Sequence, residues 1–378
     1  MSDDLTIKRV TTSVYRCPLE TPVVTSFGTM RDRPMLLVEV ESEDGVSGLG
    51  EVWCNFPSVG AEHRARLIDS VLAPLLTSRS FGSPAEAFEY LSARTAVLAI
   101  QCAEPGPFAQ AIAGIDIAMW DLASRRAGQP LFRHLNGAAD PSIGVYASGL
   151  NPGAPERLAA QKHEEGYRAF KLKVGFGRER DLANLTALRR VLGDEVRLMV
   201  DANQGWDLTT AKSMAGPLAE HRLDWLEEPL RADRPWGEWR ALAEQCSIAL
   251  AAGENLAGFE AFDAALESGA IEVVQPDVAK WGGLSACLPV ARKIISSGRR
   301  YCPHYLGGGI GLLASAHLLA AVGGDGLLEI DANPNPLRSS LLPPAMSLDA
   351  GRLRLAETPG LGDLDLANIE EFASAVGG

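Results

Sequence analysis

The stretch from residue 168 to residue 204 contains two short apolar runs, Arg-Ala-Phe-Lys-Leu-Lys-Val at 168–174 and Arg-Leu-Met-Val-Asp-Ala-Asn-Gln at 197–204. The first run carries Lys171 and Lys173 near its end, and the second reaches Asp201. From Lys173 onward, an ionisable residue closes an apolar run about every 26 residues, which is the length of one strand followed by one helix. The series is Lys173, Asp201, Glu227, Glu254, Asp277, His304 and Glu329.

Eight apolar runs alternate with helical patterns after Pro141. They lie at 143–148, 169–174, 197–201, 223–227, 248–252, 271–275, 300–304 and 327–330. Eight strand-helix units over about 190 residues predict an α/β protein with a TIM-type (β/α)8 barrel. An open sheet that binds a dinucleotide would carry a glycine fingerprint after its first strand, and the sequence has none there.

The residues before the barrel have a different pattern. Runs at 5–17 and 35–53 predict strands, with a hairpin turn at Ser42–Gly45, and helical patterns follow at 60–77, 85–99 and 107–127. The segment 21–33 is rich in Pro, Gly, Thr and Arg and is interpreted as a mobile loop. We therefore expect an α+β domain over 1–130, a barrel over 140–335, and a last segment, 336–378, that returns to the first domain because no barrel strand remains to be paired.

Charge and composition limit the partners. A formal net charge of −13 argues against binding to nucleic acid or to an anionic membrane surface. Six scattered cysteines are typical of a reducing compartment, the first residues lack a secretory signal pattern, and the most apolar stretch, 310–322, is too short to span a bilayer. We expect a cytoplasmic protein.

Three acids in consecutive units predict a metal site. Asp201, Glu227 and Glu254 close successive strands, and the ends of parallel strands meet at one rim of a barrel. Three carboxylates that close together repel one another unless a cation lies between them. Because the set contains only oxygen ligands, it favours Mg²⁺ over Zn²⁺. The alternative for any single acid is that it caps the helix that follows.

The remaining members of the series predict proton-transfer groups. Lys171 and Lys173 lie at i and i+2, so both face the barrel interior, where a nearby Mg²⁺ and a second ammonium group would lower the pKa of either lysine. Asp277 and His304 end adjacent strands, and the carboxylate would orient the imidazole. Glu329 ends the last strand and would donate a hydrogen bond to a substrate carboxylate if it is protonated.

These motifs resemble those of the enolase superfamily, and within it the mandelate racemase subgroup, over essentially the whole chain. The resemblance implies a capping domain on a modified barrel. It implies that Asp201, Glu227 and Glu254 bind Mg²⁺, that Lys173 is the base on one face, that His304 with Asp277 is the acid/base on the other, and that Glu329 contacts the substrate carboxylate. In the muconate-lactonizing subgroup a lysine stands where this chain has Asp277, with a second lysine where it has Lys280, so the chain departs from that subgroup.

The shared chemistry is abstraction of the proton alpha to a carboxylate, giving an enediolate, and the commoner outcome in the subgroup is dehydration of an acid sugar. Racemisation or epimerisation of a 2-hydroxy acid is the alternative, and relatives are often homo-oligomers. Arg31 and Arg33 are candidates to meet a distal carboxylate or hydroxyl groups, while Trp53, Phe56 and Phe27 indicate a partly apolar pocket. The candidate substrate contacts are Asn203, Arg31, Trp53 and Tyr146.

Two other classes of protein stay open at this point. Gly307–Gly311 follows the seventh strand, where many barrels bind phosphate at a helix N-terminus, so a phosphosugar lyase or isomerase is possible. A barrel that kept its metal site without catalysis is the other, and the complete set of Lys173, Asp277 and His304 argues against it.

Overall fold

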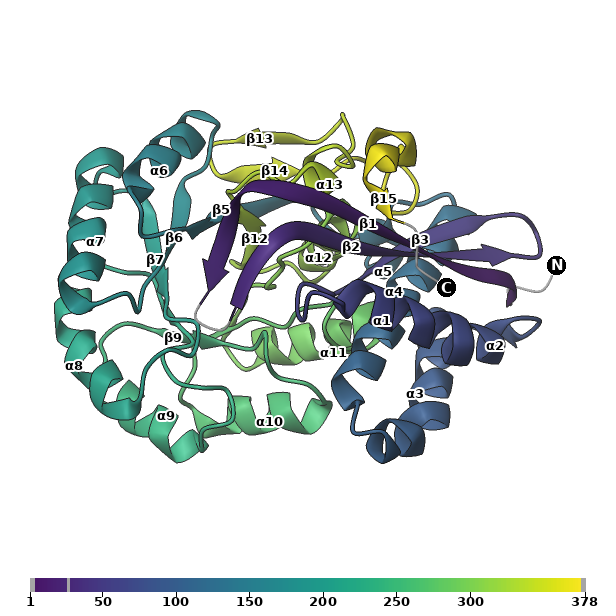
Figure 1. Ribbon diagram of the computed structural model, residues 1–378, viewed down its shortest axis with the longest axis horizontal. Coiled ribbons are helices and arrows are strands. Elements are labelled where there is room, and N and C mark those ends of the chain that lie inside the picture. The colour runs from purple at the N-terminus through teal and green to yellow at the C-terminus, as the bar shows by residue number, and fades with distance from the viewer. Residues whose placement is uncertain (1–3, 26–27, 375–378) are drawn as a thin grey trace.

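The computed structural model describes residues 4–25 and 28–374, which form two domains side by side (Figure 1). The larger domain is the predicted barrel, whose eight parallel strands pair in chain order. These strands are β5 (Ser142–Leu150), β6 (Ala169–Lys173), β7 (Arg197–Asp201), β8 (Leu226–Glu227), β9 (Leu250–Ala252), β10 (Val273–Val274), β11 (Arg300–Tyr301) and β12 (Leu327–Asp331). β12 pairs with β5, and the Leu327 N–H donates to the sulfur of Cys302 just after β11, so the ring closes.

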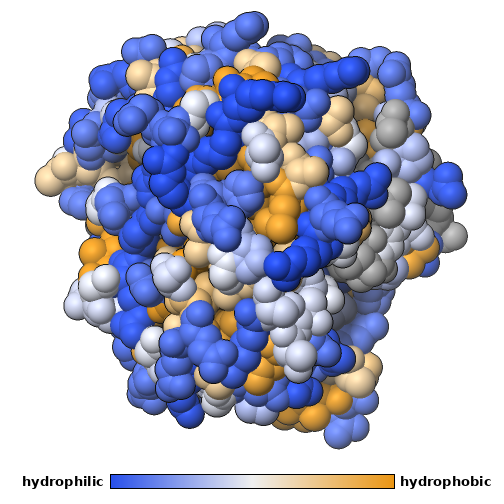
Figure 2. Space-filling view, turned by 90° about the vertical axis from the view of Figure 1, so that its left-hand side faces the viewer, coloured by the Kyte–Doolittle hydropathy of each residue, from blue (hydrophilic) through white to orange (hydrophobic). Residues whose placement is uncertain are grey.

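Helices connect the strands and cover the outside of the ring. They are α6 (Pro155–Glu164), α7 (Arg178–Leu192), α8 (Leu208–Ala219), α9 (Trp236–Ala243), α10 (Phe259–Ser268), α11 (Gly283–Ser296) and α12 (Gly309–Val322). Figure 2 shows the side of the molecule on which α7 and α8 lie, and hydrophilic residues dominate it, with apolar residues in small groups. In the described part of the chain, no helix is both long and apolar enough to cross a membrane.

A separate apolar layer fills the interior of the ring. Its members are Tyr146, Ala169, Met199, Trp225, Ala251, Val273, Cys302 and Leu327. The rings of Tyr146 and Trp225 meet edge to face with their centroids 5.3 Å apart. Tyr146 is wholly buried here and does not line the pocket, so its prediction as a substrate contact is wrong. The layer is the floor beneath the charged side chains at the strand ends.

The smaller domain combines a twisted antiparallel sheet with helices. Its elements are β1 (Leu5–Thr25), β2 (Gly28–Ser42), β3 (Ser47–Val52), β4 (Ser80–Phe81), α1 (Gly60–Leu67), η1 (Ile68–Leu72), α2 (Ala73–Leu76), α3 (Pro84–Gln101), α4 (Pro105–Arg126) and α5 (Leu131–Leu135). The longest helix, α4, packs directly on β3. A Cβ on Gly50 would lie 2.0 Å from the Gly114 carbonyl oxygen, so this approach of strand to helix requires glycine.

The predicted mobile loop at 21–33 is instead a continuation of the hairpin. β1 and β2 pair through Val24 with Thr29 and Val23 with Met30. Valine and threonine favour strands, and pairing gives the backbone groups of the segment partners. The prediction failed because proline, glycine and arginine dominated the composition. The hairpin extends from the capping domain across the barrel mouth (Figure 1), and Phe27 lies outside the described residues.

The C-terminal segment contacts both domains. It contains α13 (Pro336–Ser339), β13 (Ser347–Asp349), β14 (Arg352–Arg354), η2 (Leu366–Phe372) and β15 (Ala373–Ser374). β15 pairs with β1 of the capping sheet, but β14 first pairs antiparallel with β5 of the barrel. The expectation that no further strand joins the barrel sheet is therefore wrong. Leu353 of β14 is buried and pairs with Ile143, which explains the extra strand.

Buried carboxylates of the capping domain bind the N-termini of two barrel helices. Glu51 at the end of β3 accepts hydrogen bonds from the N–H groups of Gly308 (2.6 Å) and Gly311 (3.0 Å) at the start of α12. Asp116 of α4 accepts from the N–H groups of Leu284 (2.6 Å) and Ser285 (3.0 Å) in α11. Burial raises the pKa of Glu51, and it raises the pKa of Asp116 to about 7. These bonds join the two domains through backbone donors that helix ends leave unsatisfied.

The position of Glu51 argues against the hypothesis that phosphate binds at the glycine-rich segment. The glycines at 307–311 do form the helix N-terminus that the sequence indicated, but the Glu51 carboxylate lies at the position that an anion would take. The glycine-rich segment is therefore part of the domain interface.

Replacing Glu51 with alanine should lower the free energy of unfolding by about 2–6 kcal/mol, because two buried N–H groups lose their acceptor at about 1–3 kcal/mol each. Glu43→Ala, at an exposed position in the β2–β3 turn, is the control and should change stability by less than about 0.5 kcal/mol. Urea unfolding of both variants measures the difference. Equal stability of the two would show that Glu51 does not hold the interface.

His317 of α12 is a structural histidine. Its imidazole is buried, and its Nδ1 accepts a hydrogen bond from the Phe132 N–H of α5 at 3.1 Å. Burial lowers the pKa of His317 from 6.5 to about 3. The neutral ring therefore links α12 to the end of the capping domain.

Stability should consequently fall in mild acid through His317. The unfolded chain takes up a proton near pH 6.5 but the folded one only near pH 3, so stabilisation present above pH 6.5 is lost as the pH falls. Between about pH 7.5 and about pH 5 this loss is about 2 kcal/mol. His317→Gln should make the unfolding free energy less dependent on pH by that amount. An unchanged dependence in denaturant titrations at the two pH values would contradict this assignment.

Candidate active site

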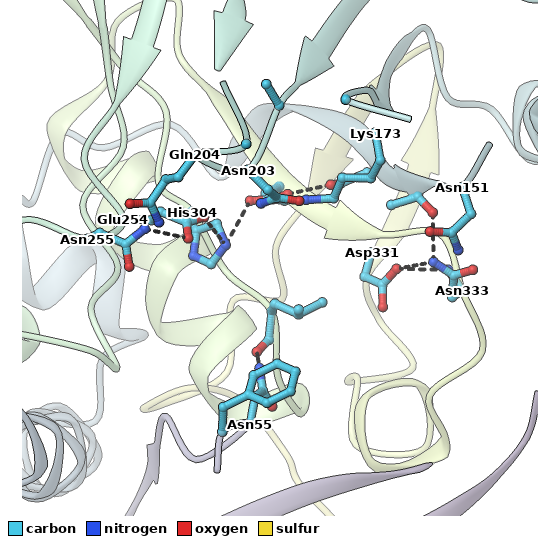
Figure 3. A pocket seen from close by; sticks show the side chains of 18 of the residues that line it. Asn55, Asn151, Lys173, Asn203, Gln204, Glu254, Asn255, His304, Asp331 and Asn333 are labelled. Carbon is cyan, nitrogen blue, oxygen red and sulfur yellow. Dashed lines mark hydrogen bonds and ion pairs between the residues drawn. The ribbon is translucent and has the colours of Figure 1, made fainter. Parts of the chain in front are cut away.

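A cavity of about 460 Å³ opens at the C-terminal ends of the barrel strands, below the capping domain. Lys173, Glu254, His304 and Glu329 of the barrel line it, together with Trp53 of the capping domain (Figure 3). In Figure 3, Lys173 and His304 enter from different strands on different sides of the pocket. Residues far apart in the sequence thus meet at one rim, as expected for the strand ends of a barrel.

The two lysines of β6 face inward and are both paired with carboxylates. Lys171 is wholly buried; its Nζ contacts the Glu227 carboxylate and lies 2.9 Å from Oε1 of Glu329 and 3.8 Å from Oδ2 of Asp201. Lys173 Nζ lies 2.5 Å from the same Asp201 oxygen and borders the cavity.

The pKa of Lys173 differs from the expectation. Burial alone would lower the pKa of this lysine, but the charges of Asp201, Glu227 and Glu329 together outweigh burial and the pKa is raised. The predicted lowering relied on a cation close to the carboxylates. In the protein chain by itself the carboxylates around Lys173 act in the opposite direction, and the lowering with a bound cation stays a prediction.

The predicted carboxylates converge at the rim as the strand order requires. Asp201 and Glu227 face each other across β7 and β8, and Glu254 follows β9. Glu227 also accepts hydrogen bonds from Trp225 Nε1 (3.1 Å) and Gln275 Nε2 (2.6 Å). Burial, with the charge of Asp201 adding to it, raises the pKa of Glu227 to about 7 although Lys171 opposes this.

A fourth acid, Glu228, belongs to this cluster and was missed in the sequence. It is buried, with its backbone in the left-handed region at φ +38°, and accepts hydrogen bonds from Asn255 Nδ2 at 2.8 and 3.1 Å. Burial and the charges of Glu254 and Asp201 raise the pKa of Glu228 well above its ordinary value. Its signal was the Glu-Glu-Pro sequence, in which only the first glutamate fits the strand periodicity.

The donor chemistry of this cluster fits a hard divalent cation. Asp201, Glu227 and Glu254 supply only carboxylate oxygens. Burial is the main cause of the raised pKa values of Glu227 and Glu228, and the neighbouring acids add to it. Within residues 4–25 and 28–374, however, no three acidic, histidine or cysteine side chains are already gathered as a closed ligand set. The Asp201 and Glu227 carboxylates are instead directed at Lys173 and Lys171.

The His304–Asp277 pair is formed. Nδ1 of His304 lies 2.8 Å from Oδ2 of Asp277, while Nε2 lies 2.8 Å from Oε2 of Glu254. Asp277 is itself held by the N–H groups of Ala279 (2.9 Å) and Lys280 (3.2 Å). Burial would lower the pKa of His304, but the charges of Glu254 and Glu329 outweigh it and raise the pKa well above its ordinary value. The ring is therefore fixed with Nε2 toward the pocket.

Glu329 is ionised, in contrast to the expectation of a protonated acid. Burial would raise its pKa, but Lys171 and His304 outweigh burial and lower the pKa to about 2. The carboxylate also accepts hydrogen bonds from the Ser148 hydroxyl and from the Tyr305 N–H at 3.3 Å. The expectation considered burial and neighbouring acids, but it did not include the ammonium group of Lys171 below.

The candidate substrate contacts separate into two groups. Trp53 and Asn203 line the pocket, whereas Tyr146 lies in the apolar floor and Arg31 is exposed on β2 outside the lining. Arg31 is exposed, whereas Arg33 is buried in the pocket wall, where it pairs with Asp331.

Sequence reasoning missed several polar residues of the wall, namely Asn55, Asn151, Asn255 and Asn333. Asn151 and Asn333 each come just beyond a predicted barrel strand. The same position at the strand end that identified the acids would have found these two residues.

The capping domain reaches the rim through the segment after β3. The Trp53 N–H donates to the Ala279 carbonyl at 3.2 Å, and Asn55 Nδ2 donates to the Leu306 carbonyl at 2.6 Å. Lys280 Nζ lies 5.0 Å from the centre of the Trp53 ring and 2.8 Å from Oδ1 of Asn255. These contacts hold part of the pocket wall on the loops that carry Asp277 and His304.

Known proteins share this architecture. Residues 7–135 match the family model of the mandelate racemase/muconate lactonizing enzyme N-terminal domain, and residues 155–364 match the enolase C-terminal domain-like model. A crystal structure of a mandelate racemase/muconate lactonizing enzyme from Bordetella bronchiseptica is 57% identical with a TM-score of 0.90, covering 97% of this chain and 99% of that one. A racemase from Streptomyces coelicolor with bound magnesium is 29% identical with a TM-score of 0.87, covering 97% and 100%.

Curated relatives are enzymes with several activities. D-galactarolactone cycloisomerase of Agrobacterium fabrum is 30% identical over 97% of this chain and 98% of its own. L-talarate/galactarate dehydratase of Salmonella typhimurium is 32% identical over 94% and 88%, and 3,6-anhydro-alpha-L-galactonate cycloisomerase of Streptomyces coelicolor is 35% identical over 75% and 78%. With the capping domain, the barrel and these matches over nearly its full length, the chain belongs to the mandelate racemase/muconate lactonizing enzyme family of the enolase superfamily.

Proposed function

We propose that the protein abstracts the proton alpha to the carboxylate of an acid sugar or related hydroxy acid, with Mg²⁺ as cofactor, and that the resulting enediolate loses water. The observation that carries this proposal is the meeting of two proton-transfer atoms, Lys173 Nζ and His304 Nε2, at one carboxylate-rich pocket. A small carboxylate with hydroxyl groups fits between them. The relatives that act on sugar acids or their lactones support the substrate class.

Lys173 and His304 would act on opposite faces of the substrate. Lys173 takes the proton at Nζ on one face, and His304 gives a proton at Nε2 to a departing hydroxyl group on the other. Asp277 keeps Nδ1 of the ring occupied, so that Nε2, which contacts Glu254 in this structure, is the nitrogen that faces the pocket. Lys171, held in place below by Glu227 and Glu329, supplies fixed positive charge near the substrate carboxylate.

Asp201, Glu227 and Glu254 would hold the metal. When bound, Mg²⁺ stabilises the extra negative charge that develops on the substrate carboxylate oxygens after proton removal. Glu228 adds a fourth acid, buried beside Glu254 and Asp201. A bound cation would offset the repulsion between these carboxylates. The related racemase structure with bound magnesium supports the choice of metal.

Racemisation or epimerisation of a 2-hydroxy acid is the alternative function. The same two bases, one on each face, would remove a proton and return it to the other side. The match to the Streptomyces coelicolor racemase favours keeping this alternative. The muconate-lactonizing subgroup has a lysine in the place of Asp277. Here Asp277 instead binds His304, which supports His304 as the proton-transfer group on that face in either reaction.

We also propose the compartment, the oligomeric state and the partners of the enzyme. We expect a homo-oligomer in the cytoplasm with a small-molecule partner and neither nucleic acid nor membrane. Val97, Leu98 and Ile100, exposed next to one another on α3, support association through that helix. The scattered cysteines and the net charge of −13 support the compartment and the absence of polyanionic partners.

Lys173→Ala and His304→Asn should each lower kcat for the acid-sugar substrate by about 10²–10⁴-fold or more, because each removes one proton-transfer group. The substrate is found by screening acid sugars and 2-hydroxy acids with Mg²⁺ in deuterated solvent. Lys212→Ala, on the outer helix α8, is the matched control and should keep full activity. Full activity of either site variant would refute the two-base proposal, and product analysis separates a 2-keto-3-deoxy acid from an inverted stereocentre.

Mg²⁺ binding should depend on the acid cluster independently of turnover. Calorimetric titration of the protein with MgCl₂ should show binding that Asp201→Asn and Glu227→Gln each weaken by about tenfold or more, because each removes a charged ligand. Glu244→Gln, at an exposed position after α9, should bind like the unaltered protein. Unweakened binding in both site variants would place the metal elsewhere.

A further inference from the structure

One side of the pocket carries a polar wall that the proposed chemistry does not use. In Figure 3, Asp331, Asn333 and Asn151 gather on the side away from His304 and Glu254. Asp331 lies two residues after Glu329 on β12, so it stands on the same side of the strand one step closer to the rim. Arg33 reaches this wall from the capping domain. A substrate bound with its carboxylate at the metal site would direct its far end here.

The Asp331 carboxylate of this wall is paired with arginine within the protein. Arg33 Nη2 lies 2.8 Å from Oδ2 of Asp331, and the two side chains are only 4% and 3% exposed. The other Asp331 oxygen, Oδ1, accepts hydrogen bonds from Asn333 N (3.0 Å) and Nδ2 (2.7 Å). Arg338 lies behind the wall, 3.6 Å from Asp331 Oδ2, and donates to the Asn333 carbonyl at 2.8 Å. Arg33 Nη2 is therefore held by the Asp331 carboxylate, while Arg33 Nε is buried without a hydrogen-bond partner among the described residues.

The other cations of the pocket are also engaged. Among the described residues that line it, the lysines and arginines are Arg33, Lys173 and Lys280. Lys173 is paired with Asp201, and Lys280 donates to Asn255 at 2.8 Å beside the Trp53 ring. A second carboxylate on the substrate would lose its water of hydration without gaining a free cation, and it would approach Asp331.

The neutral groups of the wall suit hydroxyl groups. Asn151 and Asn333 present carboxamides, which are neutral. The Nδ2 group of Asn333 already donates to the Gly149 carbonyl and to Asp331, so its oxygen is the atom left to accept from a hydroxyl group. Across the pocket, next to the Asp277 and His304 loops, Trp53 and Leu306 add apolar surface that suits the C–H face of a sugar chain. The combination matches a hydroxylated carbon chain that ends without charge.

We propose that the Arg33–Asp331 ion pair makes the pocket selective for sugar monoacids, whose far end is a neutral hydroxyl group, against the corresponding sugar diacids. This selectivity rests on the proposed function, because it concerns the far end of that same substrate. Arg33 and Asp331 are specificity residues that touch the substrate away from the reacting carbon.

The test compares aldonates with aldarates of four, five and six carbons in the presence of Mg²⁺, by calorimetric binding and by exchange of the alpha proton with deuterated solvent. The unaltered protein should favour aldonates by about tenfold or more in affinity and in kcat/KM. Asp331→Asn leaves Arg33 and Arg338 without their carboxylate. It should shift the aldarate-to-aldonate ratio by about tenfold or more toward the diacid, mainly through KM.

Two further variants keep the test decisive if Asp331→Asn does not fold. Arg33→Met should raise KM for aldonates by about tenfold, with little change in kcat, because Asp331 loses the partner that holds it in the wall. Aldarates should gain nothing, because the variant creates no cation site. Asp349→Asn, an exposed aspartate in β13, should leave the ratio unchanged.

The outcomes separate the two proposals. Equal or tighter binding of aldarates by the unaltered protein, binding of neither class, or a folded Asp331→Asn without a shifted ratio would overturn the selectivity. An unchanged KM in Arg33→Met would also overturn it. Preferential binding of aldonates without alpha-proton exchange on any sugar acid would support the selectivity and refute the proposed function. Exchange of the alpha proton that prefers aldarates would support the proposed function and refute the selectivity.

Discussion

The barrel mouth depends on the balance of charge around Lys171. This ammonium group is wholly buried and contacts carboxylates from three other strands, Asp201, Glu227 and Glu329. A buried charge is tolerated only when it is paired, and removing one partner leaves the other uncompensated. Lys171 therefore permits the acids of several strands to stand together in a site that excludes water. Its position above the apolar layer of Tyr146 and Trp225 fixes the depth at which the charged layer begins.

The site is completed only when the two domains are docked. The barrel supplies the ionisable groups at its strand ends, while Arg33, Trp53 and Asn55 bring one wall of the pocket from the capping domain. The catalytic groups and the groups that meet the rest of a ligand thus come from different parts of the chain. This division agrees with a family whose members share one architecture and carry several activities.

The periodic part of the sequence predicted the barrel and the meeting of its strand ends, because each repeat carries its own apolar run and its own terminal residue. Properties that depend on partners from other strands were harder to predict. To predict the lowered pKa of Glu329, one must know that Lys171 lies next to it. To predict the burial of Tyr146, one must know which side chains pack around it. Arg31 and Arg33 look equivalent in the sequence, and they differ in the structure because Arg33 pairs with Asp331, 298 residues away in the chain. The barrel contact of β14 was missed because a three-residue strand has too little pattern to be recognised.

The helix caps formed by Glu51 and Asp116 have a consequence for recombining domains. Each carboxylate belongs to the capping domain, yet the backbone that it completes belongs to α12 or α11, next to the loops that carry His304 and Asp277. A chimera that grafts the capping domain of a relative onto this barrel to change its ligand would have to preserve both acids. Without them, the graft would disturb the loops of the catalytic groups even if every residue of the pocket wall were transplanted correctly.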